Sequence, residues 1–215
     1  MYEAANYRIL GRVLFYVPWL SPMPPQHVWS TFAGLAALVE AISGIGASYS
    51  ANPNATQSIQ DTGKAMMKAA LLLQVVIVNL FLLLAAVFHR RCLKAGIDSR
   101  NINNALVTLY ISTCLIEIRT IYRCVEYFGV ATLHYTEGMD ANEFPPEIRY
   151  EWFFYVFEAT LMLCNAFLWN LRHPRKYIPK STKIYLDKDG VTEVTVPKDK
   201  KTKRVKWGVL GYCFA

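Results

Sequence analysis

Residues 69–88 read AALLLQVVIVNLFLLLAAVF, the clearest apolar run in the chain. Only Gln74 and Asn79 are polar, so the run lacks the polar face that a soluble helix shows at a period of about 3.6 residues. A helix needs about 20 mostly apolar residues to cross the hydrocarbon layer of a bilayer. The run therefore predicts a transmembrane helix, within a span of about residues 66–89.

Other stretches of similar length predict three further membrane spans, at about residues 28–49, 104–128 and 148–171. The first of these carries small residues at four-residue steps, Ala33, Ala37 and Ala41, followed by Gly44. Such a stripe predicts a close approach of helix backbones in the bilayer. Glu40 lies beside the stripe, and we therefore expect it to face other helices.

Residues 2–16 predict a helix stub, because the segment is too short, and too interrupted by Arg8 and Arg12, to form a complete span. The predicted fold class is all-α, a multi-pass transmembrane helix bundle of four full spans plus this stub. The chain then divides into a remnant of an upstream helix with a cytoplasmic connector, a transmembrane bundle and a basic cytoplasmic tail, at residues 1–27, 28–171 and 172–215.

Composition agrees with a membrane protein. Of 215 residues, 53% are hydrophobic and 18% are charged, yet the net charge is +7. A disordered chain would be poor in apolar residues, and a soluble nucleic-acid binder would spread its basic residues over a folded surface. Here the tail from Arg172 onward carries a net +8 and the rest of the chain carries −1. We expect the tail to meet anionic lipid headgroups, with no nucleic acid as a partner.

The distribution of charge predicts the orientation in the membrane. The connector at residues 89–100 is basic, as is the tail, and the positive-inside rule places both on the cytoplasmic side. The loops at residues 50–65 and 129–148 then lie on the opposite face. The first contains Asn54-Ala55-Thr56, an acceptor pattern for N-glycosylation. The sequence therefore predicts an integral protein of the plasma membrane or an endomembrane, with Asn54 as a glycosylation candidate.

Charged residues inside the predicted spans are the main candidates for a functional site, because a charge at membrane depth costs about 2.5–3.5 kcal/mol on insertion scales. Arg119, Arg123 and Glu126 follow one face of a helix, with Glu117 on another face, and Arg123 and Glu126 can pair within the helix. Glu40 and Glu158 on other helices are candidate partners for the arginines. One interpretation is a polar site for the head group of an amphipathic ligand. The other is a structural ion-pair network.

In the first interpretation, an anionic head would meet Arg119 or Arg123, and an amino head would meet Glu40, Glu126 or Glu158. Nothing in the sequence indicates a catalytic, cofactor or metal site. The five cysteines are far apart and odd in number, and the four histidines show no ligand spacing. We therefore expect a protein that is not an enzyme, and the sequence indicates no oligomeric state.

The stretch Arg119-Thr-Ile-Tyr122-Arg123-Cys-Val-Glu126-Tyr-Phe resembles the R-[ST]-I-Y-R-x-x-E-[YF] signature of the fungal lipid-translocating exporter family. Further motifs follow the family's order over nearly the whole chain to about residue 180. They are Leu10-Gly11-Arg12, Glu151-Trp152, the acidic Glu158 in the last helix, and His173-Pro174 at its end. The resemblance carries over Arg12, Arg119, Tyr122, Arg123, Glu126, Glu151, Trp152 and Glu158 as candidate site residues.

The resemblance implies a seven-helix protein that moves or releases lipids such as sphingoid bases, or gives tolerance of toxic sterol-like amphiphiles. Three helices precede the L-G-R motif in that family, so the chain is expected to correspond to its last part, as an N-terminally truncated member. A receptor-like sensor of lipid stress that signals through the cytoplasmic tail is the alternative. A membrane-embedded hydrolase, which would need clustered histidines, is disfavoured by the four scattered ones.

Overall fold

The computed structural model describes residues 2–96, 100–132, 150–172, 184–186 and 193–195. Nearly all of these residues are helical. The chain begins with α1 (Tyr2–Tyr16), α2 (Pro25–Ala51), α3 (Gln57–Lys94) and α4 (Arg100–Thr132), with a 3₁₀ turn, η1 (Pro18–Leu20), between α1 and α2. The last helix is continuous through α6 (Trp152–Phe154), a π-helical segment η3 (Tyr155–Thr160) and α7 (Leu161–Leu171).

Four helices in the described part of the chain are long and apolar enough to cross a membrane. They are His27–Ala51, Gln57–Lys94, Arg100–Gly129 and Trp152–Leu171. The prediction of an all-α membrane bundle with four spans and a stub is confirmed. The first three of these helices run further than the predicted spans, whereas the last begins at Trp152, inside the predicted span 148–171. Helix α3, with 38 residues, is about 57 Å long at 1.5 Å per residue.

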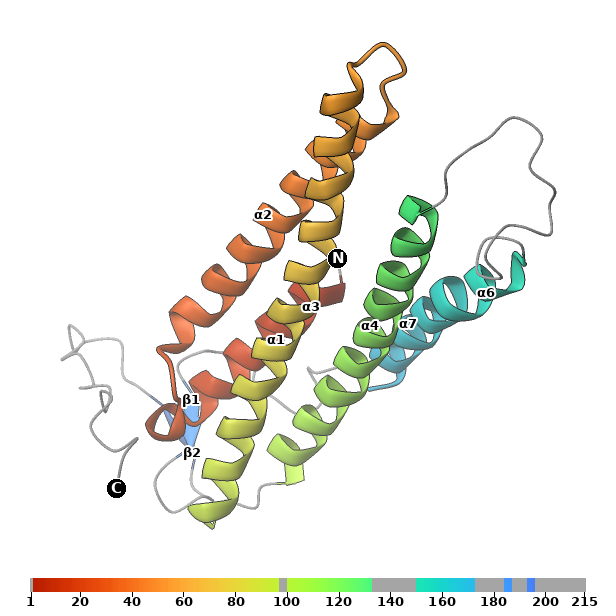
Figure 1. The fold of residues 1–215 in the computed structure, drawn as a ribbon. Helices are drawn as coiled ribbons and strands as arrows, with labels where there is room; N and C mark the ends of the chain where they lie inside the picture. Colours follow the sequence, from red (N-terminus) through yellow and green to blue (C-terminus); the bar gives the residue numbers. More distant parts are fainter. Residues whose placement is uncertain (1, 97–99, 133–149, 173–183, 187–192, 196–215) are drawn as a thin grey trace.

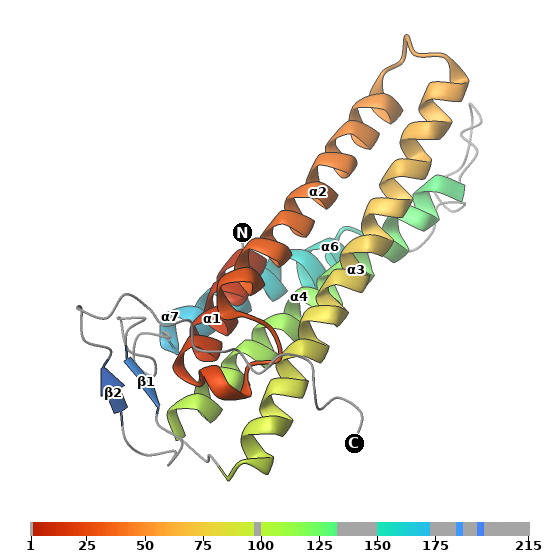
Figure 2. The same ribbon diagram turned by 90° about the vertical axis from the view of Figure 1, so that its left-hand side faces the viewer.

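The helices are arranged around α1. Figure 1 shows α2 and α3 as a long antiparallel hairpin, with α4 beside α3 and with α6 and α7 beside α4. The short α1 lies in the lower half of the bundle and contacts both α2 and α4 (Figures 1 and 2). The ends of α1, α3 and α7 and the starts of α2 and α4 therefore lie at one end of the bundle. The turn between α2 and α3 lies at the other.

The hydrophobic core is built on α1. Leu10, Leu14 and Val17 have no exposed surface, and Tyr7 packs its ring against Phe32 and Phe81 at centroid distances of 5.5 and 4.9 Å. The segment expected to be a stub is thus surrounded by other helices on most sides. By contrast, the last helix exposes large apolar side chains such as Leu163 and Phe167, as a helix in contact with lipid would.

The closest approach of α2 and α3 occurs at two glycines. A Cβ atom on Gly63 would lie 2.7 Å from the carbonyl oxygen of Gly46 and 2.7 Å from the amide nitrogen of Ser50. Only glycine fits at such a crossing, which is typical of helix pairs in membranes. The prediction that the Ala33–Gly44 stripe mediates the close contact is wrong. Ala37, Ala41 and Gly44 are exposed, and a Cβ on Gly44 would meet nothing within 4 Å.

Part of the tail folds back on the bundle. The strands β1 (Ile184–Leu186) and β2 (Glu193–Thr195) pair in antiparallel fashion, with Tyr185 opposite Val194. Leu186 is 2% exposed and joins the hydrophobic core, and β1 contacts α1. Composition predicted only a basic tail at residues 172–215, and this strand pair is an addition to that prediction.

Candidate functional site

A three-residue ion cluster joins α4 to the last helix. Arg119 donates a hydrogen bond from Nη2 to Oε1 of Glu158 at 2.9 Å. Arg123, one turn further along α4, places Nη1 3.6 Å from the other carboxylate oxygen of Glu158. One carboxylate therefore lies between two arginines from the neighbouring helix. Its side chain is 15% exposed and that of Arg119 is 26% exposed, so the hydrogen-bonded pair is largely enclosed by protein.

Of the possible partners of Arg123, the structure pairs it with Glu158 and not with Glu126. In the described residues no ion pair within 4.0 Å joins Arg123 to Glu126. Arg119 and Arg123 lie one helical turn apart on the side of α4 that faces the last helix. Glu158 therefore reaches both arginines from across the helix interface.

The π-helical segment supplies Glu158. A π turn has an extra residue, so it shifts the side chains on its surface relative to a regular α-helix, and such turns often occur at functional sites. Within it, the hydroxyl of Thr160 donates to the carbonyl of Tyr155 at 2.8 Å. The ring of Phe157, next to Glu158, stacks on Tyr122 of α4 at 5.3 Å between centroids. Tyr122 is itself 8% exposed, so this aromatic contact is a second link between α4 and the segment that carries Glu158.

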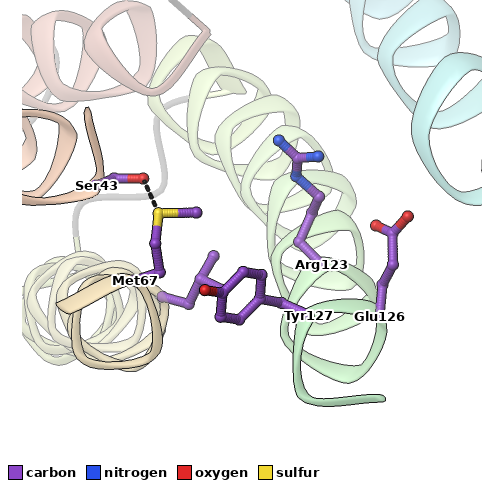
Figure 3. Close-up of a pocket in the computed structure, with 6 residues that line it drawn as sticks. Ser43, Met67, Arg123, Glu126 and Tyr127 are labelled. Carbon is purple, nitrogen blue, oxygen red and sulfur yellow. Dashed lines mark hydrogen bonds between the residues drawn. The ribbon is translucent and has the colours of Figure 1, made fainter. Parts of the chain in front are cut away.

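A pocket of about 260 Å³ lies next to the cluster, between the α2–α3 hairpin and α4. Figure 3 shows Ser43 and Met67 on one side and Arg123, Glu126 and Tyr127 on the other. Leu71 completes the lining. Arg123 thus belongs both to the ion cluster and to the pocket. Its side chain is 49% exposed, against 26% for Arg119.

The remaining charged candidates lie away from the cluster. Glu117 points toward α3, where it accepts a hydrogen bond from Nδ2 of Asn79 at 2.7 Å. Glu40 lines a separate small cavity of about 20 Å³ together with Glu3 and Gln74. Of the two candidate partners for the arginines, Glu158 therefore pairs with them, and no ion pair joins them to Glu40 in the described residues. Both polar residues of the run at 69–88 have partners, because Gln74 donates to Glu3 at 2.7 Å.

Three further candidates from the family motifs are exposed. Arg12 lies on the outside of α1, and Glu151 and Trp152 lie at the start of the last helix. Trp152 is 53% exposed and stacks on Phe153 at 3.9 Å. None of the three lines the pocket beside the cluster. The acidic loop at residues 133–149 and the His173-Pro174 motif lie outside the described residues.

Sequence reasoning missed a buried polar network at the centre of the bundle. Asn6 of α1 donates to Thr113 at 3.2 Å and accepts from Ser112 at 3.0 Å, and Trp169 of α7 donates to Ser112 at 3.1 Å. Asn6 and Ser112 are at most 1% exposed. These hydrogen bonds connect α1, α4 and α7. Small polar residues within apolar helices were the available signal, because such residues link helices in a bilayer.

Asn54 lies in the turn between α2 and α3 and is exposed, and its backbone N–H donates to Oδ1 of Asn52. The polar first part of α3 raises this turn above the apolar run. Gln57 precedes residue 69 by 12 positions, or about 18 Å along the helix. Figure 1 shows the hairpin standing well above the end of α4.

The chemistry of the cluster follows from its charges. Two arginines and Glu158 leave one positive charge in excess, and Glu126 in the pocket can balance it. Coulomb interactions are strong where water is excluded, so the Arg119–Glu158 bond fixes α4 against the last helix. This is the behaviour of a structural ion pair. Arg123, half-exposed in the pocket, has the position of a ligand-binding group.

Comparison with known proteins gives the family. Residues 1–181 match the family described as RTA1 like protein. A "Lipid-translocating exporter-like protein RTA1" of Leptosphaeria maculans is 45% identical over 195 residues, covering 89% of this chain and 37% of that protein. A protein of the same description from Ajellomyces capsulatus is 29% identical over 199 residues, covering 88% and 58%.

The chain thus spans between about a third and three-fifths of the length of these relatives. No solved structure matches it. The family match covers α1, all four membrane-spanning helices and the start of the tail. On this match, the chain belongs to the family of RTA1 like proteins.

Proposed function

We propose that this protein moves or releases amphipathic lipids, such as sphingoid bases, and thereby gives tolerance of toxic lipids. The observation that carries the proposal is the cluster of Arg119, Arg123 and Glu158 beside a pocket within the spanning helices. A lipid that crosses a bilayer must bring its polar head through hydrocarbon. Charged groups held between helices lower the cost of that step.

Two further points support the proposal. Relatives that are 45% and 29% identical carry the description of a lipid-translocating exporter-like protein. The pocket also combines charged residues with the apolar Met67 and Leu71, which suits a ligand with a polar head and an apolar chain. The proposal is one of binding and movement, and it includes no chemical reaction.

Cells that lack the protein provide the test. They should become more sensitive to added sphingoid base, and to a cationic sterol, than cells that carry it. They should also release less labelled sphingoid base into the medium. Reintroducing the gene should restore both properties. Unchanged sensitivity together with unchanged release would contradict the proposal.

A receptor-like sensor remains the second candidate, and the packing of the tail favours it. Leu186 of β1 is buried in the core beside α1, so a change in the bundle could reach the tail through this contact. Removal of residues 181–215 separates the two functions. If the protein is a sensor, the truncated chain should lose its downstream response and keep lipid release. Loss of lipid release alone would instead favour a transporter.

The location of the protein is part of the same proposal. Membrane-spanning helices make it an integral membrane protein. We propose further that it resides in the plasma membrane or an endomembrane with its tail in the cytoplasm. There the twelve basic residues from Arg172 onward would bind anionic lipid headgroups, each contributing about 1 kcal/mol near the surface.

A further inference from the structure

The pocket between the α2–α3 hairpin and α4 has a specific position along the bundle. Leu71 and Met67 of α3 lie about one and two turns before Gln74, which bonds to Glu3 near the start of α1. The pocket therefore lies beyond the first residues of α1, toward the turn that carries Asn54. Figure 3 shows that its two walls come from different elements, with Ser43 of α2 and Met67 of α3 facing α4.

The α4 wall presents one cation and one anion. Arg123 and Glu126 are three positions apart, which places their Cβ atoms about 5–6 Å from each other on a helix. The described residues give Arg123 one ion pair, at 3.6 Å, and no hydrogen bond. Its planar guanidinium therefore has N–H donors available. A guanidinium can donate two parallel hydrogen bonds to the oxygens of one phosphate, so this group suits a phosphate ligand.

The other charged group of the pocket is Glu126, and it has no ion pair within 4.0 Å in the part of the chain that the structure describes. A carboxylate in this setting suits an ammonium group. The ring of Tyr127 leaves α4 on another side and points toward Met67, so Glu126 is the group of this wall that an ammonium would meet (Figure 3). Neighbouring donors and acceptors of opposite sign are thus available to a ligand that carries both charges.

The α3 wall is apolar. Met67 faces Tyr127 (Figure 3), Leu71 also lines the pocket, and the hydroxyl of Ser43 donates to the sulfur of Met67 at 3.4 Å. This wall suits the first methylene groups of a lipid chain. Drug-sized ligands occupy pockets of about 300–1,000 Å³, so a volume of about 260 Å³ suits a head group with the start of a chain, and the rest of the lipid would extend into the bilayer.

We propose that this pocket binds a lipid head group that carries both a phosphate and an ammonium. The phosphate bonds to Arg123, and the ammonium bonds to the carboxylate of Glu126. Such a head group occurs in phosphatidylethanolamine and in a phosphorylated long-chain base. The inference rests on the proposed function, because it names the class of lipid that the pocket takes.

Binding of four fluorescent lipids to the purified chain in nanodiscs tests this proposal. Two carry both charges, phosphatidylethanolamine and a phosphorylated sphingoid base. Phosphatidic acid carries phosphate alone, and sphingoid base carries the amine alone. The two zwitterionic probes should bind about tenfold more tightly than either singly charged probe, since each charge-assisted hydrogen bond contributes on this scale. The better of the two identifies the source of the head group.

Variants assign the two charges to their residues. R123Q should remove the advantage of the phosphate, so that sphingoid base binds as well as its phosphorylated form, and R123K should lie between R123Q and the parent. E126Q should remove the advantage of the ammonium, so that phosphatidic acid binds as well as phosphatidylethanolamine. Lys94 at the exposed end of α3 is the control, and K94Q should change neither preference.

The melting temperature of each variant shows whether it folds. If R123Q does not fold, E126Q still tests the proposal, because the described residues give Glu126 no ion pair to lose. Equal binding of all four probes, or preferences that survive both R123Q and E126Q, would overturn the proposal. If sphingoid base alone binds best and is released by cells, the proposed function stands and this inference fails. If no probe binds and no lipid is released, both fail.

Discussion

Among single residues, Glu158 holds the most demanding position, because one carboxylate is shared by two arginines inside the spanning region. Its bond to Arg119 fixes α4 against the last helix, while its more distant contact with Arg123 leaves that arginine half-exposed in the pocket. The same carboxylate therefore has a structural partner and a partner that a ligand can reach. We propose that the two interpretations that the sequence left open each apply to one arginine, the structural one to Arg119 and the ligand-binding one to Arg123.

Substitution of Glu158 tests the structural half of this account. Glu158→Ala leaves Arg119 and Arg123 without their shared partner, and removing one member of a buried pair costs about 3–5 kcal/mol; the partial exposure of both arginines places the expected loss at the lower end. Glu151→Ala is the matched control, because Glu151 is exposed at the start of the same helix. Thermal unfolding of the two purified variants should show a large decrease for the first only. Equal melting temperatures would contradict the ion pair.

At the scale of elements, the α2–α3 hairpin depends on the crossing at Gly46 and Gly63. Gly63→Ala places a methyl group 2.7 Å from backbone atoms of α2, and overpacking of this kind typically costs about 1–3 kcal/mol. Gly44→Ala is the control, because its methyl group would meet nothing within 4 Å and alanine favours helix by about 1 kcal/mol. We expect Gly63→Ala to melt earlier than the parent and Gly44→Ala to melt at the same temperature or later. The opposite order would argue against the close crossing.

The elements also show how far the sequence could predict this fold. The apolar runs predicted the four spans, since a run of about 20 apolar residues is rare in a soluble helix. The small-residue stripe failed because α2 carries small residues on more than one face, and only tertiary contact distinguishes Gly46 from Gly44. No residue pattern in the sequence marks the π-helical segment that carries Glu158, so the sequence did not predict it. Strand β1 is three residues long and depends on the burial of Leu186.

The sequence predicted the residues of the candidate site better than it predicted their contacts. Arg119, Arg123 and Glu158 were identified, because charges at membrane depth are rare and need partners. Which carboxylate pairs with which arginine depends on how α4 packs against the last helix, and periodicity within one helix contains no such information. For the same reason the sequence could not choose between Glu40 and Glu158 as the partner of the arginines.

For the whole molecule, the two ends of the bundle differ. The turn at Asn54 lies at one end, and the basic connector and strand β1 lie at the other (Figure 1). The long polar start of α3 holds Gln57, just after the turn that carries Asn54, about 18 Å beyond the apolar run, so a glycosylating enzyme at the membrane surface could reach the turn. Glycosylation at Asn54 and protease access to the tail therefore report the orientation of the chain in the membrane.

Glycan mapping tests that orientation. Expressed in a fungal host, the chain should lose mass on treatment with an endoglycosidase, and Asn54→Gln should abolish the shift. An epitope tag at residue 215 should remain protected from protease in sealed vesicles that expose the lumenal face, because the tail is expected to be cytoplasmic. If the parent protein keeps its mass after endoglycosidase treatment and the tag is digested in these vesicles, the proposed topology is reversed.

The central claim is that the intramembrane cluster handles lipid. It is tested most directly by the release of labelled phosphorylated sphingoid base, whose phosphate would bind Arg123, from cells that lack the protein and are complemented with Arg123→Ala or with Lys94→Ala. Both variants remove one positive charge, but Arg123 lies in the pocket at membrane depth and Lys94 lies exposed at the end of α3. At equal protein levels, we predict that Lys94→Ala restores release to the parent rate and that Arg123→Ala falls at least about tenfold below it, the loss expected for a charge-assisted contact. Equal release by the two variants would contradict the account.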